Sequence, residues 1–573
     1  MPVSVLRRIT ALGISSMCCL LLLSSPAEAQ QGKKRKDNQA EKQFQEARDL
    51  DAGITKERDS ARALQLYQQA AKKGHALAAV WVGATIFTDA HGDRDKKAEG
   101  LRLIKQNLAA VREQADQGDA EAQFILGYIY FQGMGVAKDE QQAVVFLTKA
   151  ADQGHLSAMA GLGPLYLVGL GVAADEKKAV ELISKAADQG DPNALFYLGG
   201  LYWSGKAGVA KDEQKAAAFL TKAAEKGQTE SMTLLAQFYL TGTGVPRDKA
   251  KGVELFTRAA DNGDAEAQYQ LGSMCLNGIE IARDEKRAAE LFAKAAAQEH
   301  LDAIYNLGHV TAYGLGVDKD EAKALELFRK AAGRGHLEAT AAIGWAYLNG
   351  LGVATDEKQA AEWFTKAADQ GHIVAAFHLG SLHRSGRGVE KDGAKAVALL
   401  TKAAEAGYLD AIRNLGDMYL HGDGVAKDDA QAAQWLTKVA DAGDENAQGN
   451  LGRMYMFGEG VPQDEQKAIE LLTKSADKGN VYAMVWLADL YQNSRSGNKN
   501  EQKAVEWRIK AAEKGHIEAM RDMGKRYEQG AGVAQDKAKA LAWYKKSAAL
   551  GDEEAKQGVA RLEMKKRKKK SGL

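Results

Sequence analysis

The sequence predicts an all-α fold, an α/α right-handed superhelical solenoid of about thirteen helix-turn-helix repeats of 36 residues. A Leu-Gly pair or its variant returns every 36 residues over most of the chain, and each period holds two segments with the hydrophobic spacing of a helix. Glycine is abundant, at 59 of 573 residues, whereas proline is rare, at 6, which is typical of many helices separated by turns that require a positive φ. The composition, 45% hydrophobic and 27% charged, excludes a disordered or fibrous chain.

The N-terminal segment 1–29 is predicted to be a secretory signal peptide. Arg7 and Arg8 precede an apolar run from Ile9 to Leu23, and a small-residue site ends at Ala29, after which we expect cleavage. The alternative is a retained membrane anchor, but the run is shorter than the ~20 residues that a spanning helix requires, so no integral span is expected after cleavage. The predicted location is periplasmic or secreted, with a Gram-negative periplasm favoured and an endoplasmic-reticulum lumen left open.

After removal of this segment, Cys275 is the one remaining cysteine, so an internal disulfide is excluded and packing must stabilise the fold. The mature chain has as many acidic as basic residues, but they are unevenly placed. Residues 30–39 are predicted to be a basic disordered linker and residues 564–573 a basic disordered tail, and the body between their basic runs carries a net charge of about −10. The two segments are either solvated or contact an anionic surface or cell wall, and no nucleic-acid binding is predicted.

One repeat, residues 119–154, shows how the period becomes a helical hairpin. In its first segment Ala122, Leu126 and Tyr130 are four residues apart, and the second segment repeats this spacing. We therefore expect two amphipathic helices of about 13 residues, each roughly 20 Å long. Gly133 and Gly154 follow them, as expected for left-handed residues that end helices.

An aspartate or asparagine precedes the second segment of every repeat from residue 119 onwards. Such a side chain accepts a hydrogen bond from the free N–H groups of a helix's first turn, which is worth about 1 kcal/mol. A catalytic acid is needed at one site, whereas a cap is needed at every helix, so the periodicity predicts N-caps. The predicted caps are Asp139, Asp175, Asp212, Asp248, Asp284, Asp320, Asp356, Asp392, Asp428, Asp464, Asn500 and Asp536.

Domain boundaries follow from where the period starts and stops. Residues 40–74 are predicted to form a degenerate N-terminal repeat, residues 75–551 the solenoid, with a longer loop in its first unit, and residues 552–563 a capping helix. One residue is inserted in the loop Gly205–Gly208. The pattern also departs from the repeat at Gly278–Ile281, at Glu299 in place of a closing glycine, and at Ser494–Asn498, where we expect the solenoid to bend or loosen.

These repeats resemble the Sel1-like repeat family, a relative of the tetratricopeptide repeats with a longer loop. The elements that carry the resemblance are A-x-x-L-G-x-x-Y, G-x-G-V, D-x-x-K-A and K-A-A-x-x-G-H, as in Leu198–Gly199, Gly316–Val317 and Lys366–His372. The resemblance implies a stack of hairpins with a concave groove. It also implies an adaptor, because proteins of this family commonly act in complex assembly, envelope regulation or host interaction.

No pattern in the sequence predicts a catalytic centre, a metal site or a cofactor. His378 and His383 are five residues apart and fall on different faces of a helix, which disfavours metal binding. The S-x-x-K motif of penicillin-binding proteins and β-lactamases occurs at Ser475 and Ser496, but its partner motifs are missing. Six histidines share one repeat position, directly after a second segment ends, and are expected to be structural: His75, His155, His300, His336, His372 and His516.

By analogy with tetratricopeptide repeats, the groove is lined by three positions of each first helix: two before the Leu, one after the Gly and four after the Gly. These positions are aromatic early in the chain and charged late. Aromatic residues are frequent among binding hot spots, so the early surface is a candidate partner site, and the alternative is that its rings fill the seam between adjacent first helices. The aromatic candidates are Phe124, Tyr128, Phe131, Phe196, Trp203, Tyr269, Tyr305, Trp345 and Phe377, and the charged ones are Arg413, Asp417, Arg453, Asp489, Arg521, Lys525 and Glu528.

The function that the sequence favours is an exported, non-catalytic scaffold that binds a protein or peptide in its groove. A second hypothesis is a peptidoglycan or envelope-glycan binding protein that uses the aromatic groove and the basic tails. A third is a penicillin-binding or β-lactamase-like hydrolase at Ser475.

Overall fold

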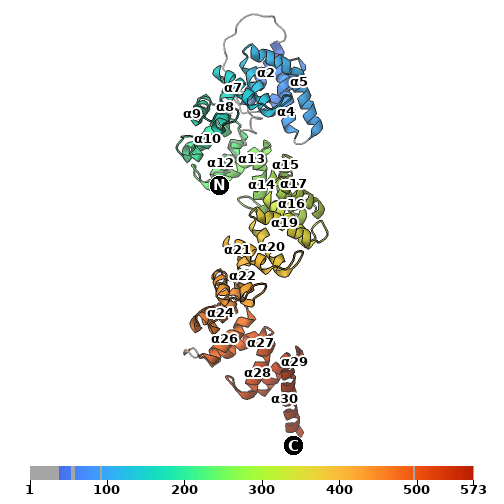
Figure 1. Ribbon diagram of the computed structural model, residues 1–573, viewed down its shortest axis with the longest axis vertical. Coiled ribbons are helices and arrows are strands. Elements are labelled where there is room, and N and C mark those ends of the chain that lie inside the picture. The colour runs from blue at the N-terminus through green and yellow to red at the C-terminus, as the bar shows by residue number, and fades with distance from the viewer. Residues whose placement is uncertain (1–37, 53–58, 91–92, 495–496, 498, 572–573) are drawn as a thin grey trace. The chain divides into compact units, whose positions relative to one another are not determined.

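The computed structural model describes residues 38–52, 59–90, 93–494, 497 and 499–571, and its helices follow one another along the chain as paired hairpins (Figure 1). The described residues form 29 helices, α2 to α30. The predicted all-α solenoid of helix-turn-helix repeats is confirmed. The predicted signal peptide and most of the predicted basic linker lie in residues 1–37, outside the described residues.

Each repeat consists of a first helix and a second helix. The first helices are α2 Asn38–Ala52, α4 Ala76–Asp89, α6 Ala120–Gln132, α8 Leu156–Val168, α10 Pro192–Ser204, α12 Thr229–Thr241, α14 Ala265–Asn277, α16 Leu301–Tyr313, α18 Leu337–Asn349, α20 Ile373–Ser385, α22 Leu409–His421, α24 Glu445–Phe457, α26 Val481–Asn493 and α28 Ile517–Gln529. The second helices are α3 Ser60–Lys72, α5 Arg94–Asp116, α7 Glu140–Asp152, α9 Glu176–Asp188, α11 Glu213–Glu225, α13 Lys249–Asp261, α15 Glu285–Ala297, α17 Glu321–Ala332, α19 Glu357–Asp369, α21 Gly393–Glu405, α23 Asp429–Asp441, α25 Glu465–Asp477, α27 Glu501–Glu513 and α29 Lys537–Ala549, and α30 Glu553–Ser571 closes the chain.

The second helices begin at the predicted caps. The backbone N–H of Gln142 donates to Asp139 Oδ1 at 2.9 Å, and the same bond recurs at every predicted Asp and at Asn500. The first helices end as predicted too, because Gly133 takes a left-handed φ of 70° and its N–H bonds to the Ile129 carbonyl. The row of aspartates is therefore a row of helix caps.

Among the described residues, three other than glycine adopt a positive φ, and each lies where the sequence departs from the repeat. They are Ala207 at 55°, Glu280 at 64° and Glu299 at 65°. A side chain in this region costs roughly 1–2 kcal/mol relative to a right-handed conformation. The described turns thus keep their backbone geometry even where the glycine is lost, which shows that the packing of the flanking helices sets the turn.

A glycine at the centre of most first helices lets the second helix approach closely. A Cβ placed on Gly127 would lie 2.7 Å from Leu147 Cγ, and one on Gly344 would lie 2.8 Å from Phe364 Cδ1. Both partners are fully buried. The Leu-Gly pair that returns through the sequence therefore marks the contact on which each hairpin closes.

The chain divides into two compact units, residues 1–327 and 328–573, which are described separately. In the first unit a continuous core runs from Phe44 to Val310. In the second unit separate buried clusters centre on α19–α20, on α21–α24 and on α25–α28.

Two predicted boundaries need correction. The extra length of the first solenoid unit is helix rather than loop, because α5 runs for 23 residues. The capping helix does not stop at residue 563, since α30 continues to Ser571 through most of the segment predicted to be disordered. Lysine and arginine favour helices, and cations near a helix C-terminus complement its dipole, so a basic run can extend a helix that is already formed.

Candidate partner-binding surface

Consecutive repeats are joined by a recurring pair of side chains, which we call the seam pair. Its first member lies three residues before the central glycine of a first helix, or before the alanine that replaces this glycine in α2 and α12. Its second member is the N-cap of the next first helix or, at the end of the chain, of α30. Phe124 and His155 form one such pair, with stacked rings whose centroids are 4.6 Å apart. His155 Nδ1 accepts the N–H of Ala158 at 3.2 Å, so Nδ1 carries no proton and Nε2 faces Glu121 Oε2 at 3.2 Å.

The chemistry of the seam pair changes along the chain while its position is kept. An aromatic ring meets a histidine or tyrosine cap, an arginine meets an aspartate cap, and a threonine hydroxyl donates to an aspartate cap. Seam pairs with a direct contact include Phe44–His75, Phe124–His155, Thr233–Asp264, Tyr269–His300, Phe377–Tyr408, Arg413–Asp444 and Arg521–Asp552.

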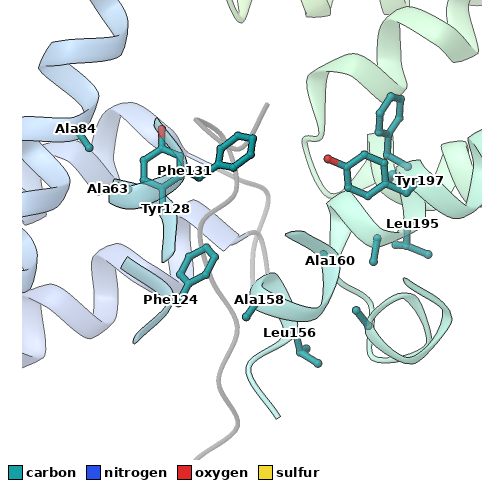
Figure 2. Packing of buried hydrophobic residues seen from close by; sticks show 14 of the residues in the cluster. Ala63, Ala84, Phe124, Tyr128, Phe131, Leu156, Ala158, Ala160, Leu195 and Tyr197 are labelled. Carbon is teal, nitrogen blue, oxygen red and sulfur yellow. The ribbon is translucent and has the colours of Figure 1, made fainter. Parts of the chain in front are cut away.

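Four predicted aromatic groove residues are buried. Phe124, Tyr128 and Phe131 project from α6 (Figure 2), and Phe196 is buried in α10. Trp81 of the preceding repeat packs against two of them, with its ring 6.2 Å from that of Phe124 and 5.8 Å from that of Tyr128. In this structure these rings contribute to the core of the first unit.

The remaining aromatic candidates are more accessible. Trp203, Tyr269, Tyr305 and Phe377 are half-buried, and of these Trp203 lies 5.7 Å from Phe238 of the next first helix. Trp345 is 39% exposed. The predicted aromatic set therefore spans core, seam and surface, and only part of it lies where a partner could reach it.

The predicted charged residues pair mainly with other residues of the solenoid. Arg413 contacts Asp444 at 2.6 Å, and Arg521 contacts Asp552 at 2.9 Å. In the same way Arg453 pairs with Glu459, Lys525 with Glu554, Asp489 with Arg508 and Glu528 with Arg561. Asp417 is half-buried, and burial raises its pKa despite the nearby guanidiniums of Arg384 and Arg413.

Two buried arginines, Arg508 and Arg526, were not among the site residues predicted from the sequence. Arg508 occupies the place that holds Leu147 or Phe364 in other repeats, and Arg526 lies in α28. Asp522 lies between them, with Oδ2 3.3 Å from Arg508 Nε and 2.9 Å from Arg526 Nε. The signal was present in the sequence, because an arginine stands at a position that is otherwise apolar.

A continuous strip of rings crosses three first helices of the second unit. The ring of Trp345 on α18 lies 4.9 Å from that of His378 on α20, and Phe377 on α20 lies 5.1 Å from His378 and 5.0 Å from Tyr408, the cap of α22. Burial lowers the pKa of His378 to about 4, so the strip is uncharged at neutral pH. Sequence analysis placed Trp345 and Phe377 on this face but missed His378 and Tyr408.

The site suggested by the S-x-x-K motif is a packing site. Ser475 is fully buried, and its Oγ donates at 2.5 Å to the carbonyl of Glu445, at the start of the first helix of the same repeat. Ser547 occupies the same repeat position and donates to the Ile517 carbonyl at 3.0 Å. Ser496 lies outside the described residues.

Within the described part of the chain, no cluster of three or more His, Cys, Asp or Glu side chains could hold a metal ion. Nor does any described helix combine the length and apolarity that crossing a bilayer requires.

The chain is similar to proteins built from one repeat. The Sel1 repeat model matches residues 50–75, 120–155, 156–191, 192–228, 229–264, 265–300, 301–336, 337–372, 373–408, 409–444, 446–480, 481–516 and 517–552. A protective antigen present in uropathogenic Escherichia coli strains, whose crystal structure displays an SLR fold, is 32% identical, with coverage of 80% of this chain and 90% of that one and a TM-score of 0.57.

Two further solved structures are more distant. A Sel1 repeat protein from Oxalobacter formigenes is 28% identical over 67% of this chain and 90% of that one, with a TM-score of 0.34. The immunity protein Pa5087 from Pseudomonas aeruginosa is 23% identical over 38% of this chain and 81% of that one, with a TM-score of 0.29. No curated protein matches the chain. The thirteen matched repeats, the confirmed helix caps and the identity to the antigen together establish that the chain belongs to the Sel1 repeat family.

Proposed function

We propose that this protein is an exported, non-catalytic scaffold that binds a protein or peptide on the exposed surface of its first helices. The observation that carries the proposal is the exposure of large aromatic side chains on first helices of the second unit: Trp345 is 39%, Phe457 57% and Tyr482 65% exposed. Exposed aromatic side chains are costly in water and are frequent at binding sites.

The second helices of the same unit present their tryptophans differently. Lys366 Nζ lies 4.1 Å from the ring centroid of Trp363, and Lys438 Nζ lies 4.4 Å from that of Trp435. A lysine held over the ring covers part of its face by a cation–π contact. This contrast favours the first-helix face, rather than the second-helix face, as the binding surface.

Export is the second part of the proposal. The Arg7–Arg8 pair, the apolar run and the small-residue site at Ala29 support it, as does the similarity to a protective antigen. N-terminal sequencing of the protein recovered from its native cells should begin at Gln30. A chain that still begins at Met1 in the cytoplasm would contradict export without touching the binding proposal.

The binding proposal is tested by cross-linked capture from the native envelope. A first-helix variant, Trp345→Ala with Phe457→Ala and Tyr482→Ala, is compared with a second-helix control, Trp363→Ala with Trp435→Ala, after circular dichroism has shown that both fold. We expect the first variant to lose a partner that the wild type and the control retain. Equal capture by all three proteins would remove the first-helix face as the binding surface.

A further inference from the structure

One first helix of the second unit departs from the capping rule of the others. Among the described first helices from α4 to α28, α22 alone begins without a side-chain capping hydrogen bond. Its N-cap residue is Tyr408, whereas the others use His, Asp, Asn or Gln, and replacing such a cap by a residue that cannot accept typically costs about 1 kcal/mol. A residue that departs from such a local rule often has a functional role, so the side chain of Tyr408 is a candidate for a role other than stabilising its helix.

The tyrosine extends the ring strip to α22. Beside the strip lie two exposed aliphatic residues, Val374 at 37% and Leu409 at 46%. Val374 is one turn before Phe377 and His378 on the same face of α20, and Leu409 directly follows Tyr408. We call Trp345, Val374, Phe377, His378, Tyr408 and Leu409 the apolar strip.

The charges around the strip are mainly negative. Glu338, Val374 and Asp410 occupy the same position in three consecutive first helices, so the exposed valine stands between two carboxylates. Arg413 contacts both Asp410 and Asp444, which leaves one guanidinium for two carboxylates. The body of the chain is also net acidic. A partner for this surface therefore needs apolar side chains in the centre and cationic side chains at the edges.

We propose that the apolar strip binds a short peptide segment of a partner protein, with two or three large apolar side chains flanked by lysine or arginine. This inference rests on the proposed scaffold function and adds to it a location and a ligand chemistry. The apolar anchors cover Trp345, Val374 and Leu409, and the flanking cations meet Glu338 and Asp410. Tyr408 contributes contact surface for the peptide, and α22 in turn lacks a side-chain capping hydrogen bond.

The first experiment selects binders from a displayed library of random peptides against the full mature chain, and measures the affinity of the selected peptides by fluorescence anisotropy. We expect sequences with paired apolar residues and flanking lysine or arginine. Trp345→Ala with Leu409→Ser should weaken them about tenfold or more, as expected when hot-spot side chains are truncated. The matched control, Trp363→Ala with Trp435→Ala, truncates aromatic residues on second helices of the same unit and should change affinity less than about twofold.

Each other outcome overturns a defined part of the idea. Selected peptides that lose affinity only in the control variant would overturn the location and leave the scaffold function standing. Peptides rich in Asp and Glu would overturn the ligand chemistry. Failure to select any binder against the folded chain would overturn both this proposal and the scaffold function for peptide partners.

A second experiment separates binding from folding at Tyr408. Tyr408→Asp restores the cap used at Asp444, so amide exchange at the start of α22 should slow about fivefold, while peptide affinity should fall about fivefold or more. Tyr408→His keeps a ring against Phe377 and also supplies an acceptor, and should lose less affinity than Tyr408→Asp. If Tyr408→Asp slowed exchange and left peptide affinity unchanged, the tyrosine would have no part in binding.

Discussion

Arg413 and Asp444 link two repeats through a carboxylate that makes two separate contacts. Asp444 Oδ1 accepts the N–H of Ala447 at 2.8 Å and thereby caps α24, while Oδ2 lies 2.6 Å from Arg413 Nη2 on the preceding first helix. The cap of one helix is thus also the acceptor for its neighbour. Asp552 makes the same two contacts, with Ala555 and Arg521, at the end of the solenoid.

Histidine performs both tasks where the neighbour is aromatic. His155 caps α8 through Nδ1, and its ring stacks on Phe124. The N-cap residue therefore both caps its own helix and contacts the preceding first helix, whichever residue types form the seam pair. This explains why residues three before the central glycine vary in type along the chain without disturbing the repeat.

The dual role predicts graded effects at Asp444. Asp444→Asn keeps a cap acceptor and loses the ion pair, which is partly exposed and worth about 0.5–1 kcal/mol, whereas Asp444→Ala loses the cap as well, for a total of about 1–3 kcal/mol. Because a long repeat array need not unfold in one step, the loss should be measured as faster amide hydrogen exchange within α24. Equal exchange in both variants would show that the cap contributes nothing at this seam.

The fold could be predicted closely from the sequence because the residues that determine helix packing, helix starts and turns recur with the same period. The central glycine, the Asp139-type caps and the left-handed Gly133-type turns each recur in the structure as expected. The extra residues of α5 were assigned to a loop because they fall outside the 36-residue period, whereas in the structure they continue the second helix. The positive φ of Glu299 could be inferred only from the glycines at its repeat position.

The candidate surface was predicted less well, and the reason is geometric. The groove positions were taken by analogy with tetratricopeptide repeats, and they identify one face of each first helix without identifying what packs against it. The predicted groove residues therefore include both Arg413, which lies in a seam pair, and Trp345, which is exposed. A usable signal was present within the chain. The residue three before the central glycine matches the cap 31 residues later, as Arg413 matches Asp444 and Phe377 matches Tyr408.

The histidine caps predict a loss of stability in acid. Burial lowers the pKa of His372 and His516 below the ordinary 6.5, against the opposing charges of Glu338 and Glu518. The folded chain then binds fewer protons than the unfolded chain, so their contribution is complete above about pH 6.5 and is lost as the pH falls toward the folded pKa values. The melting temperature should fall between about pH 7 and pH 5.

This pH dependence can be removed with caps that the chain already uses. Gln228 and Asn480 cap α12 and α26 without titrating near neutral pH. His372→Gln with His516→Asn should flatten the acid limb of the melting curve, whereas His383→Gln, at a histidine that caps no helix among those described, should leave it unchanged. An acid limb as steep as that of the wild type would assign the loss to other groups.

Asp191 predicts an effect of the opposite sign. Burial raises its pKa to about 6, even though the N–H groups of Ala194 and Asn193 and the hydroxyl of Ser157 bond to the carboxylate. A raised pKa means that the folded chain holds the proton longer, so the contribution of Asp191 falls as the pH rises from about 4 through about 6. Asp191→Asn keeps the cap and removes the buried charge. We expect a higher melting temperature for this variant at pH 7.5 and little difference at pH 4.

Substitution of the serine in the S-x-x-K motif is expected to lower stability and to have no effect on catalysis. Ser475→Ala and Ser547→Ala each remove a buried hydroxyl that donates to a carbonyl in the first helix of the same repeat, so each should cost about 1–3 kcal/mol in local stability. Amide exchange in α24 and α28 would report the two losses. Neither the wild type nor these variants should hydrolyse a chromogenic β-lactam, and turnover abolished by Ser475→Ala alone would contradict the packing role.

The buried arginines give the sharpest prediction of stability. Asp522 holds Arg508 and Arg526 together in a region where other repeats bury apolar side chains. Asp522→Ala leaves Arg508 with Asp489 and Arg526 with Glu501 as remaining carboxylate partners, so it should destabilise α27 and α28 by about 1–3 kcal/mol, the cost of hydrogen bonds lost by buried charged groups. Replacing the set together, as Arg508→Leu with Arg526→Leu and Asp522→Asn, should be neutral or stabilising, because the desolvation cost of the guanidiniums is then removed as well. Amide exchange in these two helices measures both effects. A triple variant less stable than Asp522→Ala would show that the arginines contribute more through their hydrogen bonds to Gln492 and Asp489 than their burial costs.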